Sequence, residues 1–457
     1  MKHLLTYITA LAMMAGFAKA ADAPPNIVFI LSDDQSYKDY SFMGHEVIKT
    51  PNLDKLAARS AVFTRGYVPT ALCRPSLATL ATGLYTHQHK ITGNDPSHDL
   101  AKPDTPAYDA LRERLISHMD AQPTLPKLLG EKGYLSHQSG KWWEGPYQRG
   151  GFTHGMTRGF PNKGGRHGDD GLKIGREGLQ PVLDFVDHAQ AEKKPFYLWY
   201  SPFMPHTPHT PPERLLAKYR DKVDSLNVAK YYAMCEWFDE TCGELLDYLD
   251  KKGLTENTLV YYICDNGWIQ QPDGKGYAPR SKQSPNEGGT RQPIMLSWPG
   301  VIKPGKRDEL VSSIDLVPTV LSAAGARIPE KLPGMDLMPM IRDGKKLERN
   351  TLFGETFAHD VADVDKPEAS LIFRWVIEDK WKLLLTYDGK LGRYASTHPR
   401  TEKRPQLYDL MADPDENNNL AKDNPEVVKH LAGKIASWWP VKERKVITEW
   451  SEVNEWK

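Results

Sequence analysis

Cys73 opens a segment, residues 73–83, whose residue types and spacing predict a short helix. Pro75 suits the first position of a helix, because the backbone N–H that proline lacks is not needed there, and Gly83 is a common helix end. Cys73 is therefore expected at the helix N-terminus, where free N–H groups and the helix dipole favour a bound anion. The alternative is a small buried cysteine before an ordinary helix.

Three polar clusters each follow a continuous apolar run, which is typical of a strand covered on both faces. The runs are Asn26–Leu31, Pro195–Tyr200 and Thr258–Cys264. The side chains that follow them are, in the same order, Asp33 with Asp34, His206, and Asp265 with Asn266. Ligands gather beyond the carboxyl ends of the strands in open α/β sheets. We therefore expect the three clusters to form one shared site.

The acidic and amide side chains of these clusters offer only oxygen atoms as ligands. Such a donor set suits a hard divalent cation, Ca²⁺ or Mg²⁺, and disfavours zinc. The expected ligands are Asp33, Asp34, Asp265 and Asn266. A single Asp-Asp pair after a strand is commonly a helix cap or a solvated turn. The second acidic–amide pair after another strand favours the metal interpretation.

Strands alternate with helical patterns over most of the chain, which predicts an α/β fold. We expect a large, mostly parallel (mixed) sheet sandwiched by helices. Helices are expected at Leu53–Ser60, Thr124–Lys132 and Val228–Lys252, and a fourth strand at Pro293–Trp298.

A break near Asp343–Asn350 separates a second, smaller unit, for which we expect an antiparallel sheet plus a helix. Its elements are predicted at Ile372–Val376, Trp381–Thr386 and Pro425–Trp438. The expected organisation is an α/β domain over residues 21–345 and an α+β subdomain over residues 346–457.

The first residues read as a secretory signal peptide, residues 1–20. Lys2 and His3 precede an apolar stretch, Leu4–Phe17, and Ala18-Lys19-Ala20 is a small-x-small cleavage site. The alternative, a membrane anchor, is disfavoured because the stretch is too short to span a bilayer comfortably. We expect a secreted or periplasmic protein with no transmembrane segment after cleavage. The formal net charge is zero, so the composition gives no sign of nucleic acid as a partner.

The 4 cysteines of the chain give no clear disulfide framework. Cys235 and Cys242 share an expected helix but lie about 10 Å apart along its axis, which is beyond disulfide reach. Cys264 ends an apolar strand and is expected to be buried. This leaves Cys73 for other chemistry.

The segment at Cys73 resembles the signature of the formylglycine-dependent sulfatases, arylsulfatase-like members of the alkaline phosphatase-like superfamily. The family pattern is Cys-x-Pro-Ser-Arg followed by Thr-Gly, and it is matched by Cys73, Pro75, Ser76, Thr82 and Gly83. The resemblance implies that a formylglycine-generating enzyme oxidises Cys73 to formylglycine (3-oxoalanine). It also implies an alkaline phosphatase-like fold and Ca²⁺, rather than Mg²⁺, beside residue 73 on the four oxygen ligands named above.

Three further positions match catalytic residues of that family. Lys141 lies in a Gly-Lys-Trp segment, His206 in a His-x-Pro segment, and Lys282 precedes Glu287-Gly288-Gly289-Thr290-Arg291. Lys275 is the rival for the last position. The resemblance implies that a hydroxyl of hydrated formylglycine attacks sulfur, that Lys141, His206 and Lys282 balance the charge, and that His206 or Lys282 protonates the departing alcohol.

Two positions depart from the family pattern. Leu77 replaces an Arg that lies near the metal and is read by some maturation enzymes, and Trp143 replaces a His that helps expel sulfate. Because an indole cannot accept a proton, another residue must do so, and the sequence offers His154, His167 or Lys141. Trp143 can instead stack on a sugar ring. We expect the substrate site to include His209, Trp143, His154 and His167.

The sequence thus predicts an exported sulfatase acting on a sulfated glycan or an aryl sulfate. A phosphodiesterase or phosphonate hydrolase on the same scaffold is one alternative, which the missing Arg at Leu77 disfavours because phosphate carries more charge. A non-catalytic sugar-binding homologue is the other, and Leu77 and Trp143 are the residues that favour it.

Overall fold

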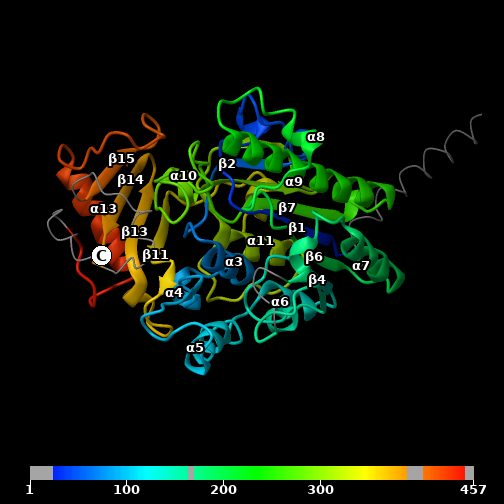
Figure 1. Cartoon of the computed structure of the whole chain (residues 1–457), viewed down its shortest axis with the longest axis horizontal. Coiled ribbons are helices and arrows are strands. Elements are labelled where there is room, and N and C mark those ends of the chain that lie inside the picture. Colours follow the sequence, from blue (N-terminus) through cyan, green and yellow to red (C-terminus); the bar gives the residue numbers. More distant parts are fainter. Residues whose placement is uncertain (1–23, 163–168, 389–404, 448–457) are drawn as a thin grey trace, which may run out of the picture.

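The structure, a computed structural model, describes residues 24–162, 169–388 and 405–447 (Figure 1). Within these residues the largest sheet has nine strands. They are β1 (Asn26–Ser32), β2 (Ala61–Tyr67), β4 (Leu135–Gly140), β5 (His154–Gly155), β6 (Phe196–Ser201), β7 (Thr258–Cys264), β8 (Arg291–Ser297), β9 (Gly305–Arg307) and β10 (Val311–Ser312).

The order of the strands in space is β10-β2-β8-β7-β1-β6-β4-β5, and β9 also pairs with β2. The four central neighbours β7, β1, β6 and β4 are mutually parallel, whereas β8 runs antiparallel to both β7 and β2. The sheet is therefore mixed and mostly parallel, as predicted. In register, Ser32 is level with Cys264, and Gly140 is level with Ser201. The chain segments that leave these strands thus start at one edge of the sheet.

Helices cover both faces of this sheet (Figure 1). Along β1, Phe29 packs into a core that includes residues of α3, α6, α11 and α12, and Val28 packs into a second core with residues of α2, α7 and α9. The helices are α2 (Pro51–Ala58), α3 (Cys73–Thr82), α6 (Leu125–Gly130), α7 (Gln180–Ala191), α9 (Leu226–Lys251), α11 (Leu316–Ala323) and α12 (Met338–Ile341). Because burial of a large apolar side chain contributes about 2 kcal/mol, the two cores fix the central strands in place.

A smaller antiparallel sheet lies at the C-terminal end of the chain, with the order β11-β13-β14-β15. Its strands are β11 (Thr351–Phe357), β13 (Leu371–Glu378), β14 (Trp381–Thr386) and β15 (Gln406–Asp409), and α13 (Pro425–Trp438) packs on it. Residues 342–350 form neither helix nor strand. The domain boundary at residue 345 stays a prediction.

Further helices and strands lie outside the two sheets and their cores. They are α4 (Thr86–His89), α5 (Pro106–Ser117), α8 (Glu213–Leu216), α10 (Glu287–Thr290) and the two-stranded pair of β3 (Asp95–Pro96) with β12 (Asp360–Val361). Among the described residues, no helix combines the length and the apolar character that crossing a bilayer requires. The predicted signal peptide, residues 1–20, lies outside the described residues.

The cysteine predictions are confirmed, since all four side chains are free and buried. Cys73 is the first residue of α3, and Gly83 ends this helix in the left-handed region with φ 71°. Pro75 is the third helical residue rather than the first. This shift is harmless because the first four N–H groups of a helix have no intrahelical partner.

Candidate active site

Asp34 and Asp265 lie in two neighbouring turns, one after β1 and one after β7, and hydrogen bonds join these turns. The backbone N–H of Asp34 donates to Asp265 Oδ1 at 3.0 Å, and Asn266 Nδ2 donates to Asp34 Oδ1 at 2.7 Å. Asp34 has φ 63°, a left-handed conformation that costs a non-glycine residue about 1 kcal/mol or more. These hydrogen bonds hold the strained turn, so the carboxylates of both strand ends lie together, as predicted.

Cys73 reaches this turn from the N-terminus of α3. Its Sγ lies 4.0 Å from Asp34 Oδ1. One ligand atom from each of Asp33, Asp34, Cys73 and His206 falls within 4.8 Å of all the others. Burial raises the pKa of Cys73 to about 12. An unmodified thiol here stays protonated at neutral pH and is a poor nucleophile.

Two buried lysines face the carboxylates. Lys141 Nζ lies 2.7 Å from both oxygens of Asp33 and 3.6 Å from Asp265 Oδ2, and Lys282 Nζ lies 2.7 Å from both oxygens of Asp34. Burial alone would lower the pKa of each lysine, but the facing carboxylates outweigh burial and raise it. Burial likewise works to raise the pKa of Asp34, yet Lys282 and then His206 hold it at about 2. The lysines are therefore charged at neutral pH.

Aromatic rings surround the ammonium group of Lys141. Its Nζ lies 5.5 Å from the ring centroid of Trp143 and 5.3 Å from that of Phe203. Rings at this distance attract a cation through their electron-rich faces. Trp143 therefore lies in the cluster, where it flanks Lys141.

His206 faces Asp34 through one ring nitrogen. Its Nε2 lies 3.3 Å from Asp34 Oδ2, and its Nδ1 lies 2.6 Å from the carbonyl oxygen of Thr207. A carbonyl can only accept a hydrogen bond, so Nδ1 carries the proton and Nε2 is the nitrogen that faces the cluster. The ring stacks on Phe203 with centroids 4.1 Å apart, which fixes its orientation.

The residues that follow β1 and β7 fit a hard divalent cation. Asp265 Oδ2 and Asn266 Oδ1 are buried and have no hydrogen-bond partner, although buried polar atoms are normally paired. Asp265 and Asn266 follow β7, and Asp33 and Asp34, which supply two more carboxylates, follow β1. A carboxylate- and amide-rich set of this kind is typical of Ca²⁺ and Mg²⁺ sites.

The structure does not bring every predicted residue to this cluster. The His209 ring lies beside it, 5.4 Å from Tyr231, and its Nε2 is buried without a hydrogen-bond partner. His154 lies on the edge strand β5, where its ring packs against His188 and Phe185. Lys275 is exposed, and Lys282 occupies the cluster instead. His167 lies outside the described residues.

Comparison with known proteins agrees with this geometry. The model of the family described as Sulfatase matches residues 25–326. Human arylsulfatase A is 31% identical over 486 residues, which cover 92% of this chain and 88% of the relative. The chain belongs to the sulfatase family. A second model, N-sulphoglucosamine sulphohydrolase, C-terminal, matches residues 281–438 of this sulfatase.

Other similar proteins agree with the fold and the chemistry. Dog N-acetylgalactosamine-6-sulfatase is 30% identical, over 73% of this chain and 69% of the relative. The crystal structure of Ps i-CgsB in complex with k-i-k-neocarrahexaose has a TM-score of 0.70 at 24% identity, over 95% of this chain and 97% of that one. The phosphonate monoester hydrolase of Agrobacterium radiobacter, at 20% identity over 90% and 95% of the two chains and a TM-score of 0.65, shares the fold. This sulfatase is therefore a sulfuric ester hydrolase with an alkaline phosphatase-like fold.

Two arginines support the cluster from outside and were not predicted. Arg74 forms an ion pair with Glu144, both buried. Arg176 binds the turn that carries His206, since its Nη2 donates to the carbonyl oxygens of Phe203 at 2.8 Å and His206 at 3.4 Å, and its Nη1 to Thr210 Oγ1 at 3.1 Å. No sequence signal marks a lone arginine whose partners are backbone atoms.

Leu77, where the family pattern has an Arg, is buried in the core that α3 shares with the large sheet. Arg74 does not replace the missing cation at the aspartates, because its guanidinium binds Glu144 and the carbonyl oxygen of Asn94. The positive charge beside Asp33 and Asp34 comes from Lys141 and Lys282.

Proposed function

We propose that this sulfatase is exported and hydrolyses a sulfate ester on a carbohydrate, with Cys73 oxidised to formylglycine beside a bound Ca²⁺. The proposed ligands of the ion are residue 73 and the oxygens of Asp33, Asp34, Asp265 and Asn266. The observation that carries this proposal is the meeting of Cys73 with buried oxygen ligands and two ammonium groups at one point of the sheet edge. When present, the ion supplies Lewis acidity and the hydrated formylglycine supplies a nucleophilic hydroxyl.

The charge of the cluster supports a sulfate monoester as substrate. Three carboxylates, Asp33, Asp34 and Asp265, face the ammonium groups of Lys141 and Lys282. Ligands of a metal are deprotonated, so the side chains carry a net charge of −1, and a divalent cation raises the total to +1. A sulfate monoester carries a single negative charge, which this total balances. A phosphate monoester carries more charge and would leave the site unbalanced.

Each polar side chain then has a task that its position allows. The ammonium groups of Lys141 and Lys282 bind sulfuryl oxygens, and their fixed position means that no reorganisation is needed as charge develops. Lys282, or His206 once its Nε2 carries a proton, gives a proton to the departing alcohol. Of the residues predicted to replace the family His at Trp143, Lys141 lies within the described cluster, but its charged ammonium group cannot accept a proton.

A carbohydrate substrate is supported by the relatives and by the aromatic residues beside the cluster. N-acetylgalactosamine-6-sulfatases are among the relatives that cover most of the chain. Trp143 offers a ring next to the lysine that binds sulfate, and rings of this kind pack against the apolar faces of sugars. His209, with an unpaired ring nitrogen on the His206 turn, is the proposed partner for a sugar hydroxyl.

Export is supported by the sequence of residues 1–20, with its basic start, apolar stretch and small-x-small cleavage site. N-terminal sequencing of protein recovered from the periplasm or medium of its host tests this part. A mature chain that begins at Ala21 is expected, and a retained Met1 on a cytoplasmic protein would contradict export.

The catalytic part is tested by sulfate release from a panel of sulfated monosaccharides, sulfated oligosaccharides and 4-nitrophenyl sulfate. We expect turnover of at least one sulfated sugar, loss of turnover in Cys73→Ala, and loss on Ca²⁺ chelation that added Ca²⁺ reverses. Turnover that persists in Cys73→Ala would contradict a catalytic role for residue 73.

A further inference from the structure

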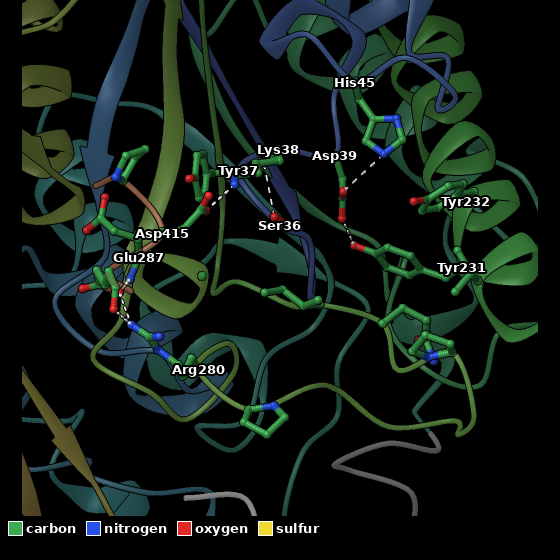
Figure 2. A pocket seen from close by; sticks show the side chains of 18 residues that line it. Ser36, Tyr37, Lys38, Asp39, His45, Tyr231, Tyr232, Arg280, Glu287 and Asp415 are labelled. Atoms are coloured by element: carbon green, nitrogen blue, oxygen red, sulfur yellow. Dashed lines mark hydrogen bonds and ion pairs between the residues drawn. The ribbon is translucent and has the colours of Figure 1, made fainter. Parts of the chain in front are cut away.

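A cavity of about 630 Å³ lies beside the cluster and is named here the Tyr232 pocket. One wall carries Asp39, His45, Tyr231 and Tyr232, and the facing wall includes Tyr37 and Arg280 (Figure 2). The catalytic lysines and Cys73 do not line it. Its volume falls in the range of small-molecule sites, about 300–1,000 Å³.

The pocket and the cluster share their chain segments. The Tyr231 hydroxyl donates to Asp39 Oδ2 at 2.7 Å and also lies 3.5 Å from the carbonyl oxygen of Asp34. Arg280 lies two residues before Lys282. The Tyr231 side chain therefore joins the pocket wall to Asp34, whose carboxylate belongs to the cluster.

Charge makes the pocket unsuitable for a second sulfate. Its lining holds two cations, Lys38 and Arg280, against four carboxylates, which belong to Asp39, Glu287, Asp415 and Glu416. Both cations are already paired, Lys38 with Asp415 at 2.5 Å and Arg280 with Glu416 at 3.8 Å. The carboxylates of Glu287 and Glu416 are in turn paired with Lys382, so the lining offers an added anion no cation that lacks a partner, whereas carboxylates accept hydrogen bonds from uncharged hydroxyl groups.

The apolar part of the lining suits the ring of a sugar. Tyr232 is half-buried, and its ring contacts His45 edge-on at 5.0 Å. Ile269, 42% exposed, adds an apolar side chain from the loop that precedes Lys282. Aromatic rings next to a few polar groups are the usual composition of sites that bind small organic ligands.

We propose that the Tyr232 pocket binds an uncharged sugar unit linked to the sulfated unit, so that the substrate is an oligosaccharide or polysaccharide chain. This inference rests on the proposed function for its biological role, and binding in the pocket can be measured separately. The sulfated unit binds at the cluster and the uncharged unit packs on Tyr232, with its hydroxyls directed to Asp39 and Arg280.

Two variants test the pocket in kinetic assays. Tyr232→Ala removes the ring, and Val228→Trp, on the same helix and in the lining, fills the space without removing a polar group. Tyr248→Ala is the matched control, because this tyrosine lies on α9 but binds Asp187 at the protein surface. We expect both pocket variants to raise KM for sulfated tetrasaccharides about tenfold with kcat unchanged, as for loss of a uniform binding contact, and to leave turnover of 4-nitrophenyl sulfate unchanged. Equal effects on both substrates, or none, would overturn the proposal.

A direct binding measurement separates this inference from the proposed function. Saturation-transfer NMR on wild-type protein would use desulfated κ-carrageenan tetrasaccharide, which is uncharged, and its sulfated parent. We expect the uncharged chain to bind, and Val228→Trp but not Tyr248→Ala to abolish the signal. Binding without any sulfatase turnover would keep the pocket and reject the proposed function. If the uncharged chain does not bind and chain length does not affect KM, the pocket proposal is wrong.

Discussion

Arg74 and Glu144 form a buried, two-point ion pair, with Nε–Oε1 and Nη2–Oε2 distances of 2.7 Å each. Arg74 directly follows Cys73 at the start of α3, and Glu144 lies three residues after Lys141 in the loop that follows β4. The pair therefore connects the two segments that supply the cysteine and the first lysine of the cluster. Its planar geometry, with two parallel hydrogen bonds, fixes orientation as well as distance.

Breaking this pair is expected to destabilise the protein strongly. Glu144→Gln leaves a buried guanidinium without its counter-charge, which typically costs about 3–5 kcal/mol. Urea unfolding gives the free energy of unfolding. Glu240→Gln is the matched control, because it breaks the exposed Arg214–Glu240 pair, for which we expect less than about 1 kcal/mol. Similar losses of unfolding free energy in the two variants would show that the buried Arg74–Glu144 pair stabilises the protein no more than the exposed pair does.

Arg176 is expected to act as a positioning residue for His206. Arg176→Lys keeps the charge but cannot bind Phe203, His206 and Thr210 at once. Because a small misplacement of a catalytic group can reduce the rate about 100-fold, we expect kcat on 4-nitrophenyl sulfate to fall at least tenfold with little change in KM. The thermal midpoint should shift by only a few degrees. A large loss of stability with unchanged kcat in the folded fraction would assign Arg176 a structural role alone.

Buried histidines are expected to make the protein acid-labile. Burial lowers the pKa of His89 to about 3, and its Nδ1 accepts a hydrogen bond from the backbone N–H of Ile91. The unfolded chain takes up a proton near pH 6.5, whereas the folded chain does not. The contribution of neutral His89 to the free energy of unfolding is thus fully present above pH 6.5. It is lost as the pH falls towards 3, at about 1.4 kcal/mol per pH unit.

The variant His89→Asn tests this effect, because an Asn oxygen can accept the same backbone hydrogen bond but does not titrate. Urea unfolding at pH 7.5 and 5.0 gives the pH dependence of each protein. We expect the loss of stability between these values to be about 2 kcal/mol smaller in the variant than in the wild type. An identical loss in the two proteins would mean that His89 is not the titrating group.

Calcium is expected to stabilise the folded chain by joining the turns that follow β1 and β7. A ligand that binds only the folded state adds about 1.4 kcal/mol for each tenfold rise in its concentration above Kd. We expect the thermal midpoint of EDTA-treated protein to rise with added Ca²⁺, and Asn266→Leu to reduce this rise sharply, since it removes an oxygen ligand. Asn227→Leu, at the exposed start of α9, is the control. A Ca²⁺-dependent rise that survives in Asn266→Leu would place the ion elsewhere.

The sequence predicts the central strands well because their burial dictates their composition. The runs at β6 and β7 agree with the structure to within a residue or so, and the polar residues after them meet as expected. The same rule misses β4, since this strand has the sequence LSHQSG and buries polar side chains, such as Gln138, that bind the neighbouring backbone. An apolar pattern cannot reveal a strand of that kind.

The supporting contacts of the site could not be predicted for a different reason. Glu144 and Arg74 are 70 residues apart in sequence, and a charged pair of that separation has no local pattern. His154 reads as a candidate base from its residue type, but its strand β5 lies at the edge of the sheet, where its ring packs on His188 and Phe185. Residue type alone therefore cannot place a histidine at a site.

The most direct test of the account is the mass of the Cys73 peptide from protein made in its native host. Oxidation of the thiol to the aldehyde of formylglycine lowers the mass by about 18 Da and creates the activated nucleophile that the mechanism requires. The account predicts this loss, with Leu77 tolerated by the maturation enzyme. A peptide that carries only unmodified cysteine in catalytically active protein would contradict it.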